Sequence, residues 1–186
     1  MAFEIDIRND QSLLPIDRAA IRRAVVTALR EEHVQSAVVS ITLVDNETIH
    51  RVNREHLQHD YPTDVISFQL EYITDNDDHA DDDEEENHSD DHETETAAES
   101  HAQDEGNAVP RCVMIEGEII ASAETAIQMA SECGWSPSSE LLLYIIHGLL
   151  HICGYDDLSP PEKTVMRSRE RHILGLLGLQ PAYPQD

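Results

Sequence analysis

The chain has 186 residues, with 38 acidic against 12 basic side chains and a formal net charge of -26. This length permits one domain with a sizeable core. Three cysteines without a CxxC pair exclude a disulfide framework and fit a reducing compartment. The alternating N-terminus "MAFEIDIRND" is not a signal peptide, and no apolar run approaches the ~20 residues of a membrane span. We therefore expect a cytoplasmic protein with no membrane partner.

The acidic charge is concentrated in residues 74–108, which contain no Lys or Arg and no apolar side chain larger than alanine. Such a stretch buries too little apolar surface to offset the entropy of ordering it. We predict a disordered insertion, most simply a solvated spacer, within a single domain spanning residues 1–186. The remaining body is only moderately acidic.

The first half of the chain alternates strands and helices. "FEIDI" alternates apolar and polar residues as a half-buried strand does, and Pro15 opens an amphipathic helical pattern. Residues 37–44 are rich in β-branched side chains and predict a strand. Asp45 then caps a short helix, and residues 63–68 form a third strand.

After the acidic stretch, residues 113–121 predict a fourth strand, and the rest is helical. One helix is capped by Ser122 and ends at Gly134, and the next begins at Ser136-Pro137 and stops at Gly154. The last begins with a capping box at Ser159 and ends at Gly178. This order is compatible with α+β or α/β. We predict an α+β domain, with a mixed sheet of about four strands packed against about five helices.

The segment "HGLLHICGYDD" carries the candidate chemistry. His147 and His151 are four residues apart, so they share one face of a helix that is otherwise apolar nearly all round. A divalent metal would satisfy two such histidines, and the turn at Gly154 can bring Asp156 or Asp157 to them as a third ligand. Three protein ligands with an open fourth position are typical of catalytic zinc. Two separately hydrogen-bonded core histidines are the alternative.

Three segments resemble the YbeY family of bacterial ribosomal-RNA maturation endoribonucleases. "HGLLHICGYDD" is similar to that family's HGxLHxxGYDH signature, "NREHLQHDYPTDVISF" to a second family segment, and "EGEIIAS" to a third. The resemblance covers the chain outside residues 74–108.

The resemblance implies a zinc site formed by the three histidines of the signature. Two of them are His147 and His151, whereas the third position is Asp157. A carboxylate is an acceptable zinc ligand, but it makes the site harder, so manganese or magnesium becomes more plausible.

Two further positions bear on catalysis. Many relatives carry an arginine where this chain has Leu57, so Arg51 or Arg54 are alternative phosphate ligands, although exposed helix charges are the simpler interpretation. Glu118 replaces a family aspartate and is a weak candidate for a general base. Gly148 stands where HExxH peptidases have their glutamate, which argues against a peptidase.

The resemblance implies a metal-dependent, single-strand-specific endoribonuclease that acts on ribosomal RNA of the small subunit and in ribosome quality control. Its implied partners are single-stranded ribosomal RNA and the ribosome, with a basic ribosomal protein as a further candidate for the acidic insertion. RNA binding needs basic surface, which only the groups Arg18/Arg22/Arg23 and Arg167/Arg169/Arg171 offer. The alternative is a metal-stabilised ribosome-assembly factor with little nuclease activity.

Overall fold

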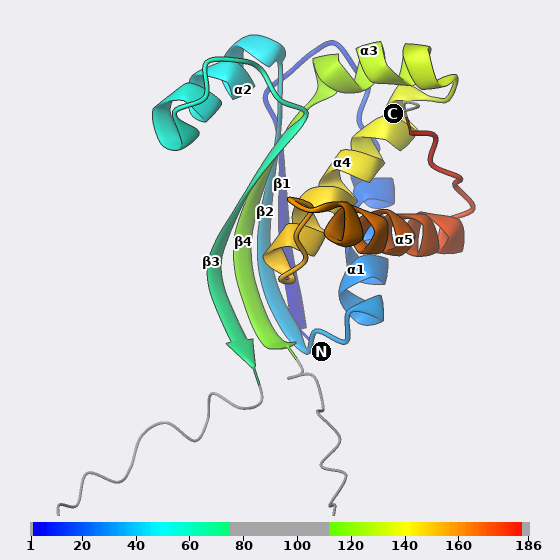
Figure 1. Cartoon of the computed structure of the whole chain (residues 1–186). Helices are drawn as coiled ribbons and strands as arrows, with labels where there is room; N and C mark the ends of the chain where they lie inside the picture. The colour runs from blue at the N-terminus through cyan, green and yellow to red at the C-terminus, as the bar shows by residue number, and fades with distance from the viewer. Residues whose placement is uncertain (1, 75–111, 184–186) are drawn as a thin grey trace, which may run out of the picture.

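The computed structural model describes residues 2–74 and 112–183, which form one sheet and the helices packed on it (Figure 1). The predicted acidic insertion lies outside the described residues, except that Thr74 belongs to the strand before it. The four strands are β1 (Ala2–Asn9), β2 (Ser36–Val44), β3 (Val65–Thr74) and β4 (Cys112–Ser122). Among the described residues, no helix combines the length and apolarity that a membrane span requires.

The sheet is mixed, as predicted, with strand order β1-β2-β4-β3. β1 pairs parallel with β2 and β2 pairs parallel with β4, whereas β3 runs antiparallel to β4 at the edge. The two strands that flank the acidic segment are therefore neighbours. A long insertion between them is tolerated because loop-closure entropy grows only slowly with length.

Five α-helices and one π-helix complete the described part of the fold, which is α+β. Their bounds are α1 (Arg18–Glu31), α2 (Asn46–Val52), π-helix η1 (Asn53–Leu57), α3 (Ala123–Cys133), α4 (Pro137–Ile152) and α5 (Pro160–Leu176). The predicted caps at Asp45, Ser122, Ser136 and Ser159 are confirmed, because each side chain accepts a hydrogen bond from a first-turn N–H.

Several predicted boundaries were wrong. The first helix begins at Arg18 instead of Pro15, because the Asp17 carboxylate accepts hydrogen bonds from the N–H groups of Ala19 and Ala20. The third strand continues past residue 68 to Thr74. The π-helix η1, which extends α2 toward β3, was not predicted.

The main core lies on one face of the sheet, where α1, α4 and α5 pack (Figure 1). α4 is its centre, with Ile145, Ile146, Leu149 and Leu150 fully buried. The opposite face has only a small cluster of Val44, Ile49, Ile66 and Ile120 beneath α2. The histidine-bearing helix is therefore held by the larger core.

Two glycines allow α4 to lie close to β3 and β4. A Cβ on Gly117 would lie 2.7 Å from Cδ1 of Ile152 and 2.8 Å from the carbonyl oxygen of Phe68. A Cβ on Gly148 would lie 3.2 Å from side-chain carbons of Ile119 and Val65. Side chains of β3 and β4 therefore fill the space beside Gly148.

Candidate metal centre

α4 directs His147 and His151 to a common point, as their spacing predicts. The two rings are nearly perpendicular, with an interplanar angle of 86°, and their Nε2 atoms are 3.1 Å apart. Both side chains are partly buried, so they remain accessible from the surface.

The turn after α4 adds a carboxylate to this pair. Gly154 has a φ of 91°, which glycine adopts without strain, and the chain reverses there. Asp157 Oδ1 then lies 3.7 Å from Nε2 of His151. His147, His151 and Asp157 each offer one ligand atom, and these atoms lie within 4.8 Å of one another. Asp156 is exposed and accepts a hydrogen bond from the Asp157 N–H, so of the two aspartates Asp157 is the one in the cluster.

The other ring nitrogens are occupied by acceptors. Nδ1 of His147 donates to Oε1 of Glu170 at 2.7 Å, and Nδ1 of His151 donates to the carbonyl oxygen of Tyr155 at 3.0 Å. A neutral imidazole with its proton on Nδ1 has a lone pair on Nε2. Two such lone pairs face each other across 3.1 Å, which is favourable only with a cation between them.

This geometry fits a divalent ion. Zn–N bonds of about 2.0–2.1 Å in a tetrahedral site place two ligand nitrogens roughly 3.3 Å apart. A metal-binding histidine typically donates its second N–H to a carboxylate or a carbonyl, and both kinds of partner are present. His147, His151 and Asp157 therefore form a candidate metal centre.

Both outer partners are themselves held by α1 or the C-terminal segment. Glu170 is buried and also accepts a hydrogen bond from the Tyr183 hydroxyl at 2.6 Å. The Tyr155 hydroxyl donates to Glu32, the C-cap of α1, and Glu32 is paired with Arg169 at 2.7 Å. The orientation of each histidine is thus fixed by contacts with segments that lie far from it in the sequence.

The pKa of His147 reflects this environment. Burial is the largest influence and disfavours the imidazolium, but the hydrogen bond and charge of Glu170, together with the charges of Asp64 and Asp157, outweigh it. The net effect raises the pKa of His147 above its ordinary value of 6.5. The site attracts positive charge, which a metal ion would supply.

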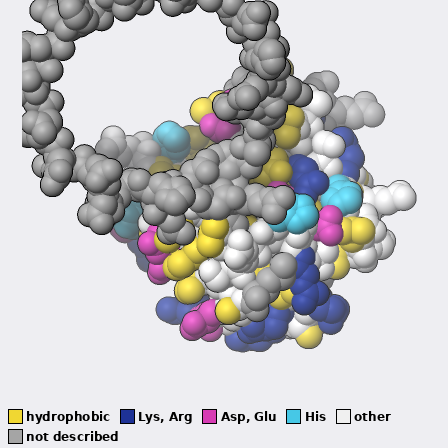
Figure 2. Space-filling view, turned by 90° about the horizontal axis from the view of Figure 1, so that it is seen from below, with side chains coloured by type: hydrophobic (Ala, Val, Ile, Leu, Met, Phe, Trp, Pro, Cys, Tyr) yellow, Lys and Arg dark blue, Asp and Glu magenta, His cyan; other side chains and the backbone are white. Residues whose placement is uncertain are grey.

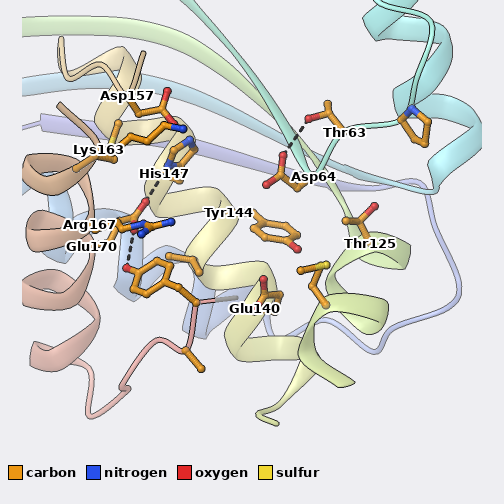
Figure 3. Close-up of a pocket in the computed structure, with 16 residues that line it drawn as sticks. Thr63, Asp64, Thr125, Glu140, Tyr144, His147, Asp157, Lys163, Arg167 and Glu170 are labelled. Atoms are coloured by element: carbon orange, nitrogen blue, oxygen red, sulfur yellow. Dashed lines mark hydrogen bonds and ion pairs between the residues drawn. The ribbon is translucent and has the colours of Figure 1, made fainter. Parts of the chain in front are cut away.

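Two cavities meet at His147, each of about 420 Å³. One lies between α4, α5 and the C-terminal segment, and the other between α4, η1 and β3; both are lined by Thr63, Asp64 and His147. Figure 3 shows the Asp64 carboxylate in the first cavity, across from the α5 side chains. Oδ1 of Asp64 accepts hydrogen bonds from the Thr63 hydroxyl and the Val65 N–H, each at 2.9 Å.

The structure does not bring Glu118 to the cluster. Its neighbours Gly117 and Ile119 contact α4, so Glu118 points to the opposite face of the sheet, beside Phe68 of β3. The weak candidate for a general base is therefore directed away from the cluster by the strand that carries it.

The basic residues are distributed differently from the prediction. Arg51 and Arg54 are exposed and line neither cavity, whereas Leu57 lines the second cavity. Arg18 and Arg22 donate to backbone carbonyls of β1, and Arg169 pairs with Glu32. In the view of Figure 2, basic side chains lie beside acidic and histidine side chains. Of the predicted basic groups, only Arg167 lines a described cavity at the site.

Sequence reasoning missed three contributors to the site: Asp64, Lys163 and the orienting role of Glu170. Glu170 left a readable signal, because it interrupts the buried stripe of Met166, Ile173 and Leu174 on α5. An acidic residue in such a stripe needs a partner. Asp64 and Lys163 left no local signal, since their positions depend on how distant segments pack.

The fold and the site define a mixed-sheet α+β protein with a candidate three-residue metal centre formed by its central helix and the turn after that helix. A family model described as Endoribonuclease YbeY matches residues 6–178, and the chain belongs to this family. Three similar relatives are named Endoribonuclease YbeY. The protein of Rhodopirellula baltica is 37% identical over 91% of this chain and 69% of its own length. That of Bacillus licheniformis is 34% identical over 96% and 98%, and that of Carboxydothermus hydrogenoformans is 34% identical over 94% and 98%.

Proposed function

We propose that this chain is a metal-dependent endoribonuclease that cleaves single-stranded ribosomal RNA during maturation of the small ribosomal subunit. The observation that carries the proposal is the convergence of two Nε2 atoms and one carboxylate oxygen, with both Nδ1 atoms held by acceptors. The names of the relatives favour a nuclease over a metal-stabilised assembly factor.

The metal would be held by Nε2 of His147, Nε2 of His151 and Oδ1 of Asp157. We propose zinc, while the carboxylate ligand widens the site toward manganese or magnesium. When bound, such an ion supplies a Lewis acid that polarises a phosphoryl oxygen and makes a nearby water more acidic. Glu170 and the Tyr155 carbonyl keep both histidines in the ligand tautomer.

Asp64 is our candidate for the proton acceptor in place of Glu118. Its carboxylate lies in the cavity beside His147, on a different element from the metal ligands (Figure 3). Its Oδ1 is fixed by Thr63 and Val65, which orients the group toward the cavity. A carboxylate held in this way can take a proton from the attacking water.

The test combines elemental analysis with a cleavage assay on single-stranded ribosomal RNA. Purified protein should contain about one equivalent of metal, whereas His147→Ala and Asp157→Ala should lose metal and cleavage together. Asp156→Ala is the matched control, because it removes the neighbouring, exposed carboxylate and should retain both. Equal metal content in wild type and Asp157→Ala would remove Asp157 from the ligand set.

Two other outcomes would revise the function. Equal cleavage by wild type and His147→Ala would indicate a contaminating nuclease. Metal-loaded wild type that associates with the small subunit but cleaves no RNA would favour the assembly factor.

We further propose a basic ribosomal protein as the partner of the acidic segment, on charge alone. Deletion of residues 75–108 should then weaken ribosome association without changing cleavage of free RNA. Unchanged association would argue against a partner role.

A further inference from the structure

Lys163 is the only lysine of the chain, and it lies at the metal centre. It is in the first turn of α5, and Arg167 follows it by four residues, so both side chains lie on one face of the helix. Both line the cavity that His147 and Asp157 also line (Figure 3). Two cations are thus concentrated beside the metal ligands in a protein of strongly negative net charge.

Arg167 is oriented by the same network that orients His147. Its guanidinium lies 5.1 Å from the ring centroid of Tyr183, whose hydroxyl donates to Oε2 of Glu170. Oε1 of Glu170 accepts the hydrogen bond from His147. The arginine therefore lies over a ring whose hydroxyl is hydrogen-bonded to the carboxylate that holds His147.

Most acidic groups of this cavity already have partners. Asp157 belongs to the metal cluster, and Glu170 accepts hydrogen bonds from His147 and Tyr183. Glu140, at the far end, accepts a hydrogen bond from Trp135. Asp64, on the wall opposite α5, accepts hydrogen bonds from its neighbours Thr63 and Val65.

The second cavity differs, because its lining contains no Lys or Arg. That lining includes Leu57, Ser67 and Gln69, together with the residues that both cavities share and the two histidines. Of the two described cavities at the site, only the one beside α5 is lined by cationic side chains. An RNA backbone that reaches the metal centre therefore meets cations on that side. Neutralising phosphates supplies most of the sequence-independent affinity for nucleic acid.

We propose that Lys163 and Arg167 bind backbone phosphates of single-stranded RNA on the α5 side of the metal centre. The inference rests on the proposed function for the identity of the ligand. It assigns the two residues to substrate binding, at the cavity that His147 and Asp157 also line.

The test measures binding of a fluorescent single-stranded RNA 12-mer to metal-free protein in EDTA, by anisotropy, over a series of salt concentrations. Each phosphate contact contributes about 0.7 to the slope of log K against log salt for a single strand. Lys163→Gln and Arg167→Gln should each lower the slope by about 0.7 and the affinity about fivefold at 0.1 M salt. The double variant should lose about twice the slope, and Lys163→Arg should bind as wild type.

Arg171→Gln is the matched control. Arg171 is on the same helix and its guanidinium lies 4.8 Å from the Tyr183 ring centroid, but it lines neither cavity. The Arg171→Gln substitution removes the same charge and should leave RNA binding nearly unchanged. If Lys163→Gln and Arg167→Gln bind no worse than Arg171→Gln, the proposal is wrong.

The single lysine allows a second measurement without substitution. Reductive ¹³C-methylation keeps the positive charge and gives one lysine methyl signal in the NMR spectrum. Addition of the RNA to metal-free protein should shift that signal, and an unmoved signal at saturation would overturn the role of Lys163.

The two proposals fail separately. Metal-loaded protein that cleaves RNA, with a double variant that binds like Arg171→Gln, would refute the phosphate contacts and leave the nuclease intact. Metal-loaded protein that does not cleave, with binding lost in the double variant, would do the reverse.

Discussion

The two walls of the candidate metal centre are built differently. The α4–α5 wall carries the two histidines, the buried Glu170 and the cations Lys163 and Arg167, and it rests on the main core. The η1–β3 wall is formed by an exposed π-helix and an edge strand above a four-residue cluster. Hydrogen bonds fix the side chains of the α4–α5 wall, whereas the η1–β3 wall has few buried contacts.

This difference separates two requirements of the site. Metal ligands must keep their geometry, and a buried helix with outer hydrogen bonds provides that rigidity. A long polymer must enter and leave, which an exposed edge permits. Asp64 lies on the less buried wall and lines both cavities, so it connects the two parts of the site.

The largest effect should come from Asp64→Asn. If Asp64 accepts the proton, the amide cannot, and turnover should fall by about 10²–10⁴-fold. Metal content and RNA affinity should stay near wild type, because the ligands are on the other wall. Asp60→Asn is the control, since Asp60 is exposed and contacts His50. Comparable loss of turnover in both variants, or loss of metal in Asp64→Asn, would refute this role.

Glu170→Gln tests the rigid wall. The amide still accepts a hydrogen bond from His147 but lacks the charge that favours the ligand tautomer. Loss of such outer partners typically costs 10- to 100-fold in metal affinity, so we expect about 10-fold for this conservative change. Competition with a metal chelator would measure it. Tyr183→Phe, which removes only the second hydrogen bond to Glu170, should have a smaller effect, and equal affinities for all three proteins would contradict the assignment.

The rigid wall was also the more predictable one. The i, i+4 histidines and the glycine turn are close in sequence, so local periodicity and turn chemistry predicted a cluster with Asp156 or Asp157, and the family resemblance pointed to Asp157. The partners that orient them come from α5 and from Tyr155, whose hydroxyl donates to Glu32 at the end of α1. Those contacts depend on helix packing, which no local pattern encodes.

The η1–β3 wall escaped prediction for another reason. The continuation of β3 to Thr74 depends on pairing with β4, which follows only after the acidic segment. The sequence could not decide on which face Glu118 lies, because alternation along a strand leaves open which face meets the helix. The sheet contacts of Gly117 and Gly148 decide that question.

Leu57→Arg would reduce the contrast between the walls. The side chain is 43% exposed and lines the cavity beside both histidines, so an arginine there can reach RNA phosphate without entering the core. One added contact should raise affinity about fivefold at 0.1 M salt and steepen the salt slope by about 0.7. Leu57→Gln is the uncharged control. An equal gain in both variants would show that the effect is not electrostatic.

The smallest effect concerns the far end of the α4–α5 wall. Burial raises the pKa of Glu140 above its ordinary value of 4.5, although hydrogen bonds from Trp135 and Tyr144 oppose the shift. A carboxyl whose folded pKa is raised stabilises the fold below the unfolded pKa, and that contribution is lost as pH rises through the folded value. Glu140→Gln keeps an acceptor for Trp135 but cannot ionise. Urea unfolding of both proteins between about pH 4.5 and 7 should show the variant gaining stability relative to wild type as pH rises. A constant difference across that range would mean that Glu140 ionises in the fold as readily as in the unfolded chain.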